Sequence, residues 1–429
     1  MTEAFLQYVW QHKLLEGPLT TVDGLAVSVE RAGELNRNAG PDFFDARIVV
    51  DGVLWAGNVE VHIKASDWNA HKHSNDRAYN NVILHVVYIH DADIVLENGK
   101  HVATIDISQA VPDYVWENYE KLMNPADDSK IACAKRLPEI PDFLFNISQE
   151  RLLIERIERK SGNVERLLNE SKGNWEETAY WLVAHYFGGK VNAFPFELLA
   201  KVTPMRIVAK IKDNPFRVEA LYFGQSGLLE AEVQDEYSQR LKREYNYLSA
   251  AYGLRPEAGH LWKFFRVRPS SFPTLRISQF ANLMTRSENI FSKLLEADDV
   301  QTLRGLFRVR ASDYWQTHFD FDKPSENVPV NLGKNLADNI IINAWIPLLF
   351  QYGVTHGSER SKNKALELLH QLPPENNRIV RLWRDAGKEM RNAAESQSAI
   401  QRYTEYCSRK QCLECPLAFR LLKTKTEQR

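Results

Sequence analysis

Histidine and carboxylate side chains crowd into one short part of the chain, residues 40–90. Five of the twelve histidines lie there, well above the share that an even spread would give. Imidazole and carboxylate groups together are what a divalent metal ion or a general acid–base site requires. This stretch is therefore the first candidate for a functional site.

The first arrangement in this stretch sets carboxylates on two neighbouring strands. Asp42 follows Gly40-Pro41 before one predicted strand, and Glu60, His62 and Lys64 alternate along one face of the next. Carboxylates with waters suit Mg²⁺ or Mn²⁺. An ion held there activates water and stabilises the charge that grows on a phosphate under attack. This arrangement predicts an oxygen-rich metal pocket at Asp42 and Glu60, with the basic or ligating side chains of His62 and Lys64 on the same face.

The same stretch offers a different metal site. His71 and His73 lie two residues apart, and Asp76 follows. In an extended segment both imidazoles point the same way and, with a carboxylate, bind Zn²⁺ or Fe²⁺. An ordinary structural interpretation also stays open, in which the polar side chains cap turns, pair along a solvated strand or pack in the core.

The four cysteines form the second notable pattern. Cys407, Cys412 and Cys415 lie within nine residues, and Cys133 is far away in the chain. Four cysteines are too few for a disulfide scaffold of this length, so a reducing compartment is expected. A tetrahedral metal site built from cysteines has four thiolate ligands. The four cysteines together therefore predict a bound Zn²⁺ ion or an iron–sulfur cluster. The alternative is an ordinary buried thiol at Cys133 and an unpaired trio.

A basic stretch lies between Glu257 and Glu288, where the chain has no acidic residue. Its positive charges are interleaved with aromatic residues, which suits phosphate pairing beside base stacking. The alternative is that the aromatic residues pack the core while the charges face solvent. The predicted nucleic-acid-binding residues are Lys263, Arg266, Arg268 and Arg276.

The elements expected around the histidine and carboxylate stretch are a helix, antiparallel strands, a helix and a strand. The first fifteen residues have amphipathic helical spacing. Residues 43–50 and 53–64 are strand-like and flank the hairpin signal Asp51-Gly52. Residues 74–81 are expected to form a short helix. Residues 82–89 are continuous and β-branched, which predicts a buried strand.

From about residue 140 the apolar residues recur with helical spacing. Helices are predicted over residues 149–168, 235–252, 277–295, 336–352, 361–371 and 376–393. Prolines between residues 108 and 138 mark the junction. The sequence therefore predicts an α+β fold, with an α/β domain over residues 1–125, in which helices flank a mixed sheet, and a mostly α-helical domain over residues 126–429.

The order of elements around Pro41-Asp42 and Glu60-Val61-His62 resembles the core of the PD-(D/E)xK nuclease superfamily. The resemblance implies that Asp42 and Glu60 bind the metal and that a lysine two residues after the glutamate positions or activates the water, a role that falls here to His62 or Lys64. Here His62 occupies that position, and Lys64 lies one step further along the same face. The cysteines resemble the split set of some of these nucleases, in which the distant cysteine precedes the motif, whereas Cys133 follows it.

The chain also resembles, over most of its length, a bacterial family known as a domain of unknown function. The resemblance is clearest in GPDFFDARI, in GNVEVHIKASDWNAHKHSNDRAYNNVILHVV and in the terminal YCSRKQCLECPL. It implies no particular activity.

Composition limits the other possibilities. The 54 basic and 56 acidic residues nearly balance, so a polyanion must be bound by a local patch. No apolar run approaches the ~18 residues that span a bilayer, and the start of the chain lacks a signal-peptide pattern. A cytoplasmic protein with no membrane partner is expected. Walker, GxSxG, HExxH and dinucleotide motifs are absent from the sequence.

The predicted function is metal-dependent phosphodiester hydrolysis on nucleic acid, with DNA favoured over RNA. One alternative is a nucleic-acid-binding or scaffold protein without turnover, which the missing lysine two residues after Glu60 favours. Another is a metal-dependent hydrolase of a different class, centred on His71, His73 and Asp76.

Overall fold

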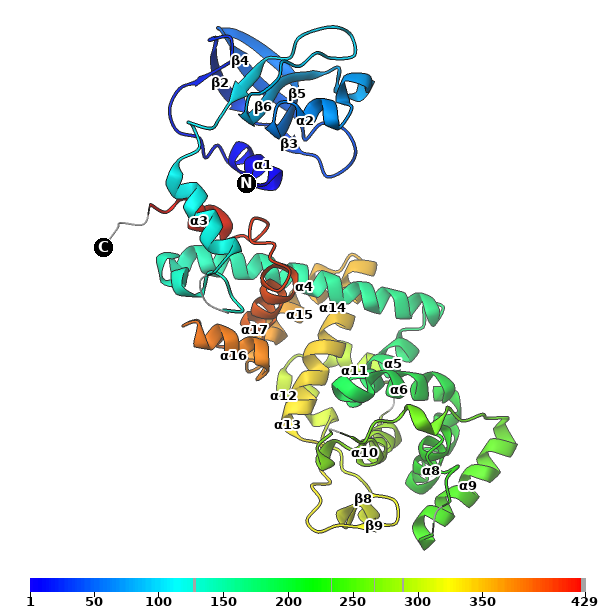
Figure 1. Ribbon diagram of the computed structural model, residues 1–429. Helices are drawn as coiled ribbons and strands as arrows, with labels where there is room; N and C mark the ends of the chain where they lie inside the picture. Colours follow the sequence, from blue (N-terminus) through cyan, green and yellow to red (C-terminus); the bar gives the residue numbers. More distant parts are fainter. Residues whose placement is uncertain (126–128, 233, 266, 288, 426–429) are drawn as a thin grey trace. The chain divides into compact units, whose positions relative to one another are not determined.

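The computed structural model describes residues 1–125, 129–232, 234–265, 267–287 and 289–425 (Figure 1). Contacts divide the chain into two compact units. Unit 1 comprises Met1–Ser148, Leu382–Lys388 and Arg402–Arg429, and unit 2 comprises Gln149–Arg381 and Glu389–Gln401. A sheet in unit 1 and helices through the rest of the chain confirm the α+β fold. The boundary after residue 125 is predicted for two domains that fold separately. The two units are defined by contacts, so that boundary stays a prediction.

The sheet of unit 1 is mixed, with its strands in the order β1-β2-β4-β5-β6-β7 and with β3 paired to β4. An antiparallel bridge between Thr21 and Ile105 joins the chain after β1 to β7, at the opposite end of that order. The strands are β1 (Leu19–Thr20), β2 (Ala26–Arg31), β3 (Glu34–Leu35), β4 (Phe43–Val50), β5 (Val53–Lys64), β6 (Val82–Ile89) and β7 (Thr104–Asp106).

The hairpin between β4 and β5 is confirmed. Val50 pairs with Val53 in antiparallel register, and the two residues between them, Asp51 and Gly52, have φ angles of 48° and 80°. Two left-handed residues match the right-handed twist of the flanking strands, which is why Asp-Gly is favoured there. The turn fixes the register that sets Glu60 on β5 close to Asp42.

Strands β5 and β6 are parallel, so residues 65–81 must cross back from the end of one to the start of the other. This crossover contains a short helix, α2 (Asp67–Ala70), and two 3₁₀ turns, η1 (His73–Asn75) and η2 (Arg77–Tyr79). The single helix predicted over residues 74–81 is wrong. Asp76 is extended between the two turns and caps the second, its Oδ1 accepting a hydrogen bond from the Ala78 backbone N–H.

Helix α1 (Glu3–Gln11) packs against β5 and begins at Thr2, whose hydroxyl caps the Phe5 backbone N–H (Figure 1). Its apolar face is buried, and the indole of Trp10 donates a hydrogen bond to the Ala32 carbonyl. The other helices wholly in unit 1 are α3 (Asp113–Met123), η3 (Ala134–Glu139), the π-helical turn η8 (Arg402–Cys407) and α18 (Ala418–Lys423).

Unit 2 is helical around one large apolar core. Two predicted helices are interrupted: residues 277–295 break near Asn289, which is left-handed, and residues 376–393 break after Asp385, before the left-handed Gly387. A π-helical turn, η7 (Ile341–Trp345), and a small hairpin of β8 (His318–Asp320) and β9 (Lys323–Pro324) complete the unit. The helices lying in or running into unit 2 are α4 (Asp142–Glu170), α5 (Trp175–Phe187), α6 (Gly189–Val202), α7 (Met205–Ile211), α8 (Pro215–Gln225), α9 (Glu236–Tyr252), α10 (Pro273–Arg286), α11 (Ile290–Glu296), α12 (Val300–Leu306), α13 (Lys334–Ile340), α14 (Ile346–Thr355), α15 (Glu359–Gln371), α16 (Arg378–Asp385) and α17 (Ala393–Gln401), with the short turns η4 (Gly259–Leu261), η5 (Pro269–Ser271) and η6 (Asp313–Gln316). Among the described residues, the helices are all too short or too polar to cross a bilayer.

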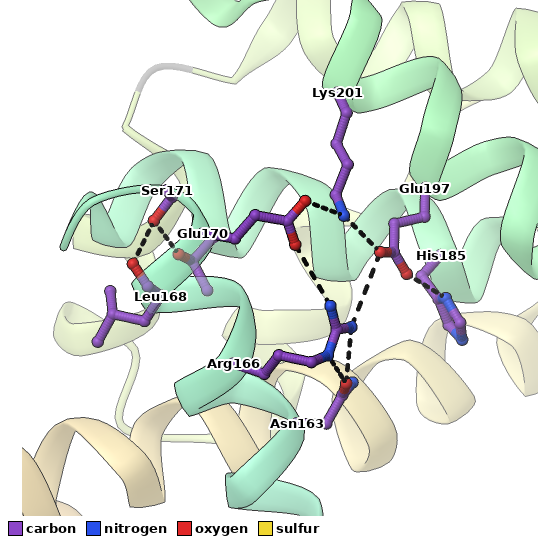
Figure 2. Close-up of polar contacts among 9 residues, drawn as sticks. Asn163, Arg166, Leu168, Glu170, Ser171, His185, Glu197 and Lys201 are labelled. Atoms are coloured by element: carbon purple, nitrogen blue, oxygen red, sulfur yellow. Dashed lines mark hydrogen bonds and ion pairs between the residues drawn. The ribbon is translucent and has the colours of Figure 1, made fainter.

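A network of ion pairs ties three helices of unit 2 together (Figure 2). Lys201 on α6 bridges Glu170 on α4, at 2.7 Å, and Glu197 on its own helix, at 2.9 Å. His185 on α5 lies 2.9 Å from Glu197. The hydrogen bond with His185 and the contact with Lys201 lower the pKa of Glu197 to about 2. The ionised carboxylate therefore stabilises the fold.

Glu197→Gln is expected to lower the free energy of unfolding at pH 7 by about 1–3 kcal/mol. Because the pKa of this carboxyl is lower in the folded chain, its contribution is complete above about pH 4.5 and is lost as the pH falls toward 2. Urea unfolding at pH 7 and pH 3 should show the difference from wild type shrinking by more than half. Glu165→Gln, on the exposed side of α4, is the control and should change little; an equal loss there would contradict the assignment.

Candidate metal centre

Strand β5 carries two polar side chains into a buried environment. Glu60 and His62 alternate with Val59 and Val61, so both faces of the strand are covered at this point, and Glu60 and His62 are only 4% and 1% exposed. Buried polar groups need partners. In the parallel register Glu60 stands beside His85 on β6.

Glu60 and Asp42 hold each other in place through the backbone. Glu60 Oε2 accepts a hydrogen bond from the Asp42 backbone N–H at 2.9 Å, and Asp42 Oδ2 accepts one from the Val61 backbone N–H at 3.1 Å. This exchange occupies one oxygen of each carboxyl. The other oxygen of Glu60, Oε1, lies 3.5 Å from His62 Nε2 and 3.3 Å from His73 Nε2.

The crossover between β5 and β6 brings two more histidines over His62. His71 ends α2, Lys72 is left-handed with φ 64°, and His73 begins η1, so the chain reverses between the two imidazoles. The rings of both histidines lie 5.1–5.4 Å from the ring of His62. One ring nitrogen each of His62, His71 and His73 lies within 4.8 Å of the other two.

Aromatic packing fixes this part of the crossover. Trp68 is fully buried in a small core with Tyr79, and its indole donates a hydrogen bond to the Ser74 hydroxyl. His73 stacks on Tyr79 with ring centroids 3.8 Å apart. His71 is exposed, so the cluster is open to solvent on its side. The arrangement is therefore rigid on one side and accessible on the other.

The hydrogen bonds of His62 determine which of its nitrogens faces the cluster. Nδ1 lies 2.9 Å from His85 Nε2, and Nε2 lies 3.2 Å from His71 Nδ1. When His62 is protonated on Nδ1 it donates to His85, which leaves the Nε2 lone pair facing His71 and Glu60. An outer hydrogen bond of this kind orients metal-binding histidines in known sites.

His62, His73 and His85 are uncharged at neutral pH. Burial, reinforced by the neighbouring histidines, lowers the pKa of His62 to about 3 and that of His73 to about 4, and it holds the pKa of His85 well below 6.5. Neutral imidazole is the form that binds metal. The lone pairs of His62 and His73 therefore converge with a carboxyl oxygen and lack a positive charge of their own.

The carboxyl groups respond to burial in the opposite direction. Burial and the nearby Asp42 raise the pKa of Glu60 to about 8, and burial raises the pKa of Asp42. A cation between Glu60 and the histidines would offset the cost of burying the carboxylate charge. The donor set of three imidazoles and one carboxylate fits Zn²⁺, Fe²⁺ or Mn²⁺.

The carboxylate site and the histidine site, which the sequence offers as alternatives, lie in one place. Asp42, Glu60 and His62 adjoin His71 and His73, whereas Asp76 is exposed and caps η2. Lys64 is exposed, and its charge acts on Asp91.

Helix α1 also supplies polar groups that sequence reasoning misses. Gln7 hydrogen-bonds Asp42, and the charges of Glu3 and Asp42 act on each other. Glu3 and Gln7 are four residues apart, so both lie on one face of α1. The same spacing is common on helices whose polar face is simply exposed to solvent. No signal in the sequence separates the two cases.

The basic stretch of unit 2 is only partly a surface feature. Arg266 lies outside the described residues. Lys263 and Arg268 are exposed, whereas Arg276 is largely buried, donates to Gln279 Oε1 at 2.9 Å, and has a pKa lowered by burial to about 10. Trp262 is buried, and Phe264 and Phe272 are half-buried and contact each other, as the alternative interpretation expects, whereas Phe265 is 81% exposed.

Comparisons with known proteins give one match. No curated protein and no solved structure is significantly similar to the chain, and the resemblance to the PD-(D/E)xK core stays a prediction. Residues 3–378 match a family model described as a protein of unknown function. That range holds the whole candidate metal centre and Cys133 but ends before the other three cysteines. The chain therefore belongs to this family, DUF2851.

Proposed function

We propose that this chain is a metal-dependent hydrolase whose ion is bound by His62, His71 and His73, with Glu60 as the fourth ligand. The convergence of the three ring nitrogens within 4.8 Å of one another carries the proposal. The neutral imidazoles of His62 and His73 lie next to the buried carboxyl of Glu60, an environment that favours a divalent cation.

A bound ion of this kind lowers the pKa of a coordinated water and supplies hydroxide at neutral pH. The protein's own side chains have the remaining roles in the proposed reaction. His85 holds the Nδ1 proton of His62 and so fixes its orientation. Asp42, anchored on the Val61 backbone N–H beside Glu60, is the candidate general base. The exposed side at His71 is where substrate enters.

The proposed substrate is the phosphodiester of a nucleic acid, DNA before RNA, in the cytoplasm. Paired carboxylates beside a metal suit phosphoryl chemistry, in which charge grows on the phosphate oxygens. The exposed Lys263 and Arg268 of unit 2 are candidates for phosphate contacts.

A second candidate is a Mg²⁺ or Mn²⁺ site on Asp42 and Glu60 alone. The observation in its favour is that the two carboxyls are side by side, each with one oxygen uncommitted to the backbone exchange. Metal preference separates the two candidates because Mg²⁺ binds oxygen ligands and waters and leaves imidazole unused.

The test uses chain stripped of metal by chelator and then supplied with Zn²⁺, Mn²⁺, Fe²⁺ or Mg²⁺ separately. Binding is measured by calorimetry, and cleavage is measured on labelled single- and double-stranded DNA and RNA. Loss of one equivalent of bound Zn²⁺, Mn²⁺ or Fe²⁺, together with loss of cleavage, in a His62→Ala, His73→Ala double variant would support the proposal. Cleavage with Mg²⁺ that survives in this variant would favour the carboxylate pair. Binding without turnover on any substrate would leave a binding protein, and no binding would overturn both sites.

A further inference from the structure

All four cysteines belong to unit 1, although Cys133 is distant in sequence from the other three. Cys133 stands at the start of η3, Cys407 ends η8, and Cys412 and Cys415 lie in the loop that leads into α18. All four are present as thiols, with no disulfide. They line one cavity of about 20 Å³, together with apolar side chains from α3 and α18.

The size of this cavity limits what it can hold. A volume of this order accommodates about one water-sized object. A single metal ion fits, whereas a four-iron cluster would require its walls to separate. Four thiolates at about 2.3 Å around one ion are the ordinary structural zinc site.

The loop that carries three of the thiols is tightly turned. Lys410 is left-handed with φ 55°, and the Gln411 backbone N–H donates to the Tyr406 carbonyl. The Cys415 backbone N–H then donates to the Cys412 carbonyl at 3.2 Å, which closes the two-residue spacer between these thiols. Both thiols of this Cys-x₂-Cys pair line the cavity.

An independent observation concerns Arg402, which also lines the cavity. It is only 1% exposed, and two of its nitrogens, Nε and Nη1, have no hydrogen-bond partner among the residues that the structure describes. Nη2 donates to the Ser148 hydroxyl, and the guanidinium lies over the rings of Phe145 and Trp383 at 4.6 and 5.5 Å. A buried guanidinium with unused donors requires a negative partner to offset the cost of its burial.

Neutral thiols do not supply that partner. Metal binding deprotonates the thiols. Four thiolates around one divalent ion leave a net charge of about −2, and the charges of Cys133, Cys407 and Cys415 act on Arg402.

We propose that Cys133, Cys407, Cys412 and Cys415 bind one structural Zn²⁺ and that Arg402 compensates the negative charge of the thiolate centre. The centre is separate from the histidine centre and does not depend on the hydrolase proposal. It fastens the loop before α18 to the start of η3.

The test measures metal in chain purified without chelator and without oxygen. A Cys412→Ser, Cys415→Ser double variant should lose one equivalent of zinc, whereas His62→Ala, His73→Ala should keep it. Ser408→Ala, which changes an exposed hydroxyl next to Cys407, is the matched control and should also keep it. Zinc retained in full by the cysteine variant would overturn the proposal, whatever the histidine variant does.

A second measurement covers a cysteine variant that fails to fold. Wild-type chain is titrated with a mercurial, and zinc release should track reaction of the four thiols, which are all the cysteines in the chain. Iron with acid-labile sulfide would support four thiolate ligands but overturn the single ion. Reduced wild type that contains no metal and takes up neither added Zn²⁺ nor Co²⁺ would overturn the centre altogether.

Discussion

His73→Ala is expected to weaken binding of the ion at the histidine centre by at least about 100-fold, with a similar loss of hydrolytic rate. Even residues that only hydrogen-bond to metal ligands are worth about 10- to 100-fold. His73 faces Glu60 Oε1 at 3.3 Å and contributes one of the three converging nitrogens. Calorimetric titration of the stripped protein with Zn²⁺ or Mn²⁺ measures the first effect, and initial rates of cleavage measure the second.

Two companion variants make this result specific. His85→Asn, which removes the partner of His62 Nδ1, should lose about 10- to 100-fold in affinity because the ligand is no longer oriented. Asp76→Ala should leave affinity unchanged, since its carboxylate is exposed and caps η2. Loss of binding in Asp76→Ala with binding intact in His73→Ala would contradict the donor set.

Gly224→Ala is expected to lower the free energy of unfolding by about 3 kcal/mol, at the upper end of the cost of overpacking a core. A β-carbon on Gly224 of α8 would overlap the ring of Tyr245 on α9. The ring cannot easily move away, because its hydroxyl donates to Gln225 Oε1 and Gln225 in turn donates to the Val202 carbonyl. Denaturant unfolding followed by tryptophan fluorescence measures the loss.

Gly162→Ala is the matched control for this substitution. Gly162 also lies within a helix of unit 2, but a β-carbon there would meet nothing within 4 Å. Alanine is the better helix former, so this variant should be more stable by about 0.5–1 kcal/mol. If Gly224→Ala lowers the free energy of unfolding and Gly162→Ala raises it, close helix packing at Gly224 is established. Equal destabilisation by the two substitutions would contradict it.

The parts of the fold that were predictable are those in which local chemistry decides the structure. The strands over residues 43–50, 53–64 and 82–89 are confirmed, because their side-chain patterns and the Asp51-Gly52 turn act over a few residues. The short strands β1, β3 and β7 have two or three residues each. Their pairing depends on partners distant in sequence, which no local pattern reveals.

The candidate site was predictable in its residues but not in its assembly. The sequence indicates two competing sites, one at Glu60 and His62 and the other at His71 and His73. It does not reveal the direction in which the crossover folds. Because β5 and β6 pair in parallel, the crossover returns over the buried end of β5 and brings His71 and His73 to Glu60 and His62. Arg402 gave no signal at all, since its burial beside the thiols depends on tertiary packing that the sequence does not reveal.

Unit 1 is discontinuous: its last segment, residues 402–429, follows the whole of unit 2 in the chain. During synthesis at about 5–20 residues per second, the ribosome emits the sheet roughly half a minute before α18 exists. Until then α3 lacks the partner to which Asn118 and Arg136 donate hydrogen bonds, the carbonyls of Leu421 and Leu422. The side of α3 that packs against α18 therefore stays uncovered until residues 418–423 have been synthesised, long after the sheet is complete.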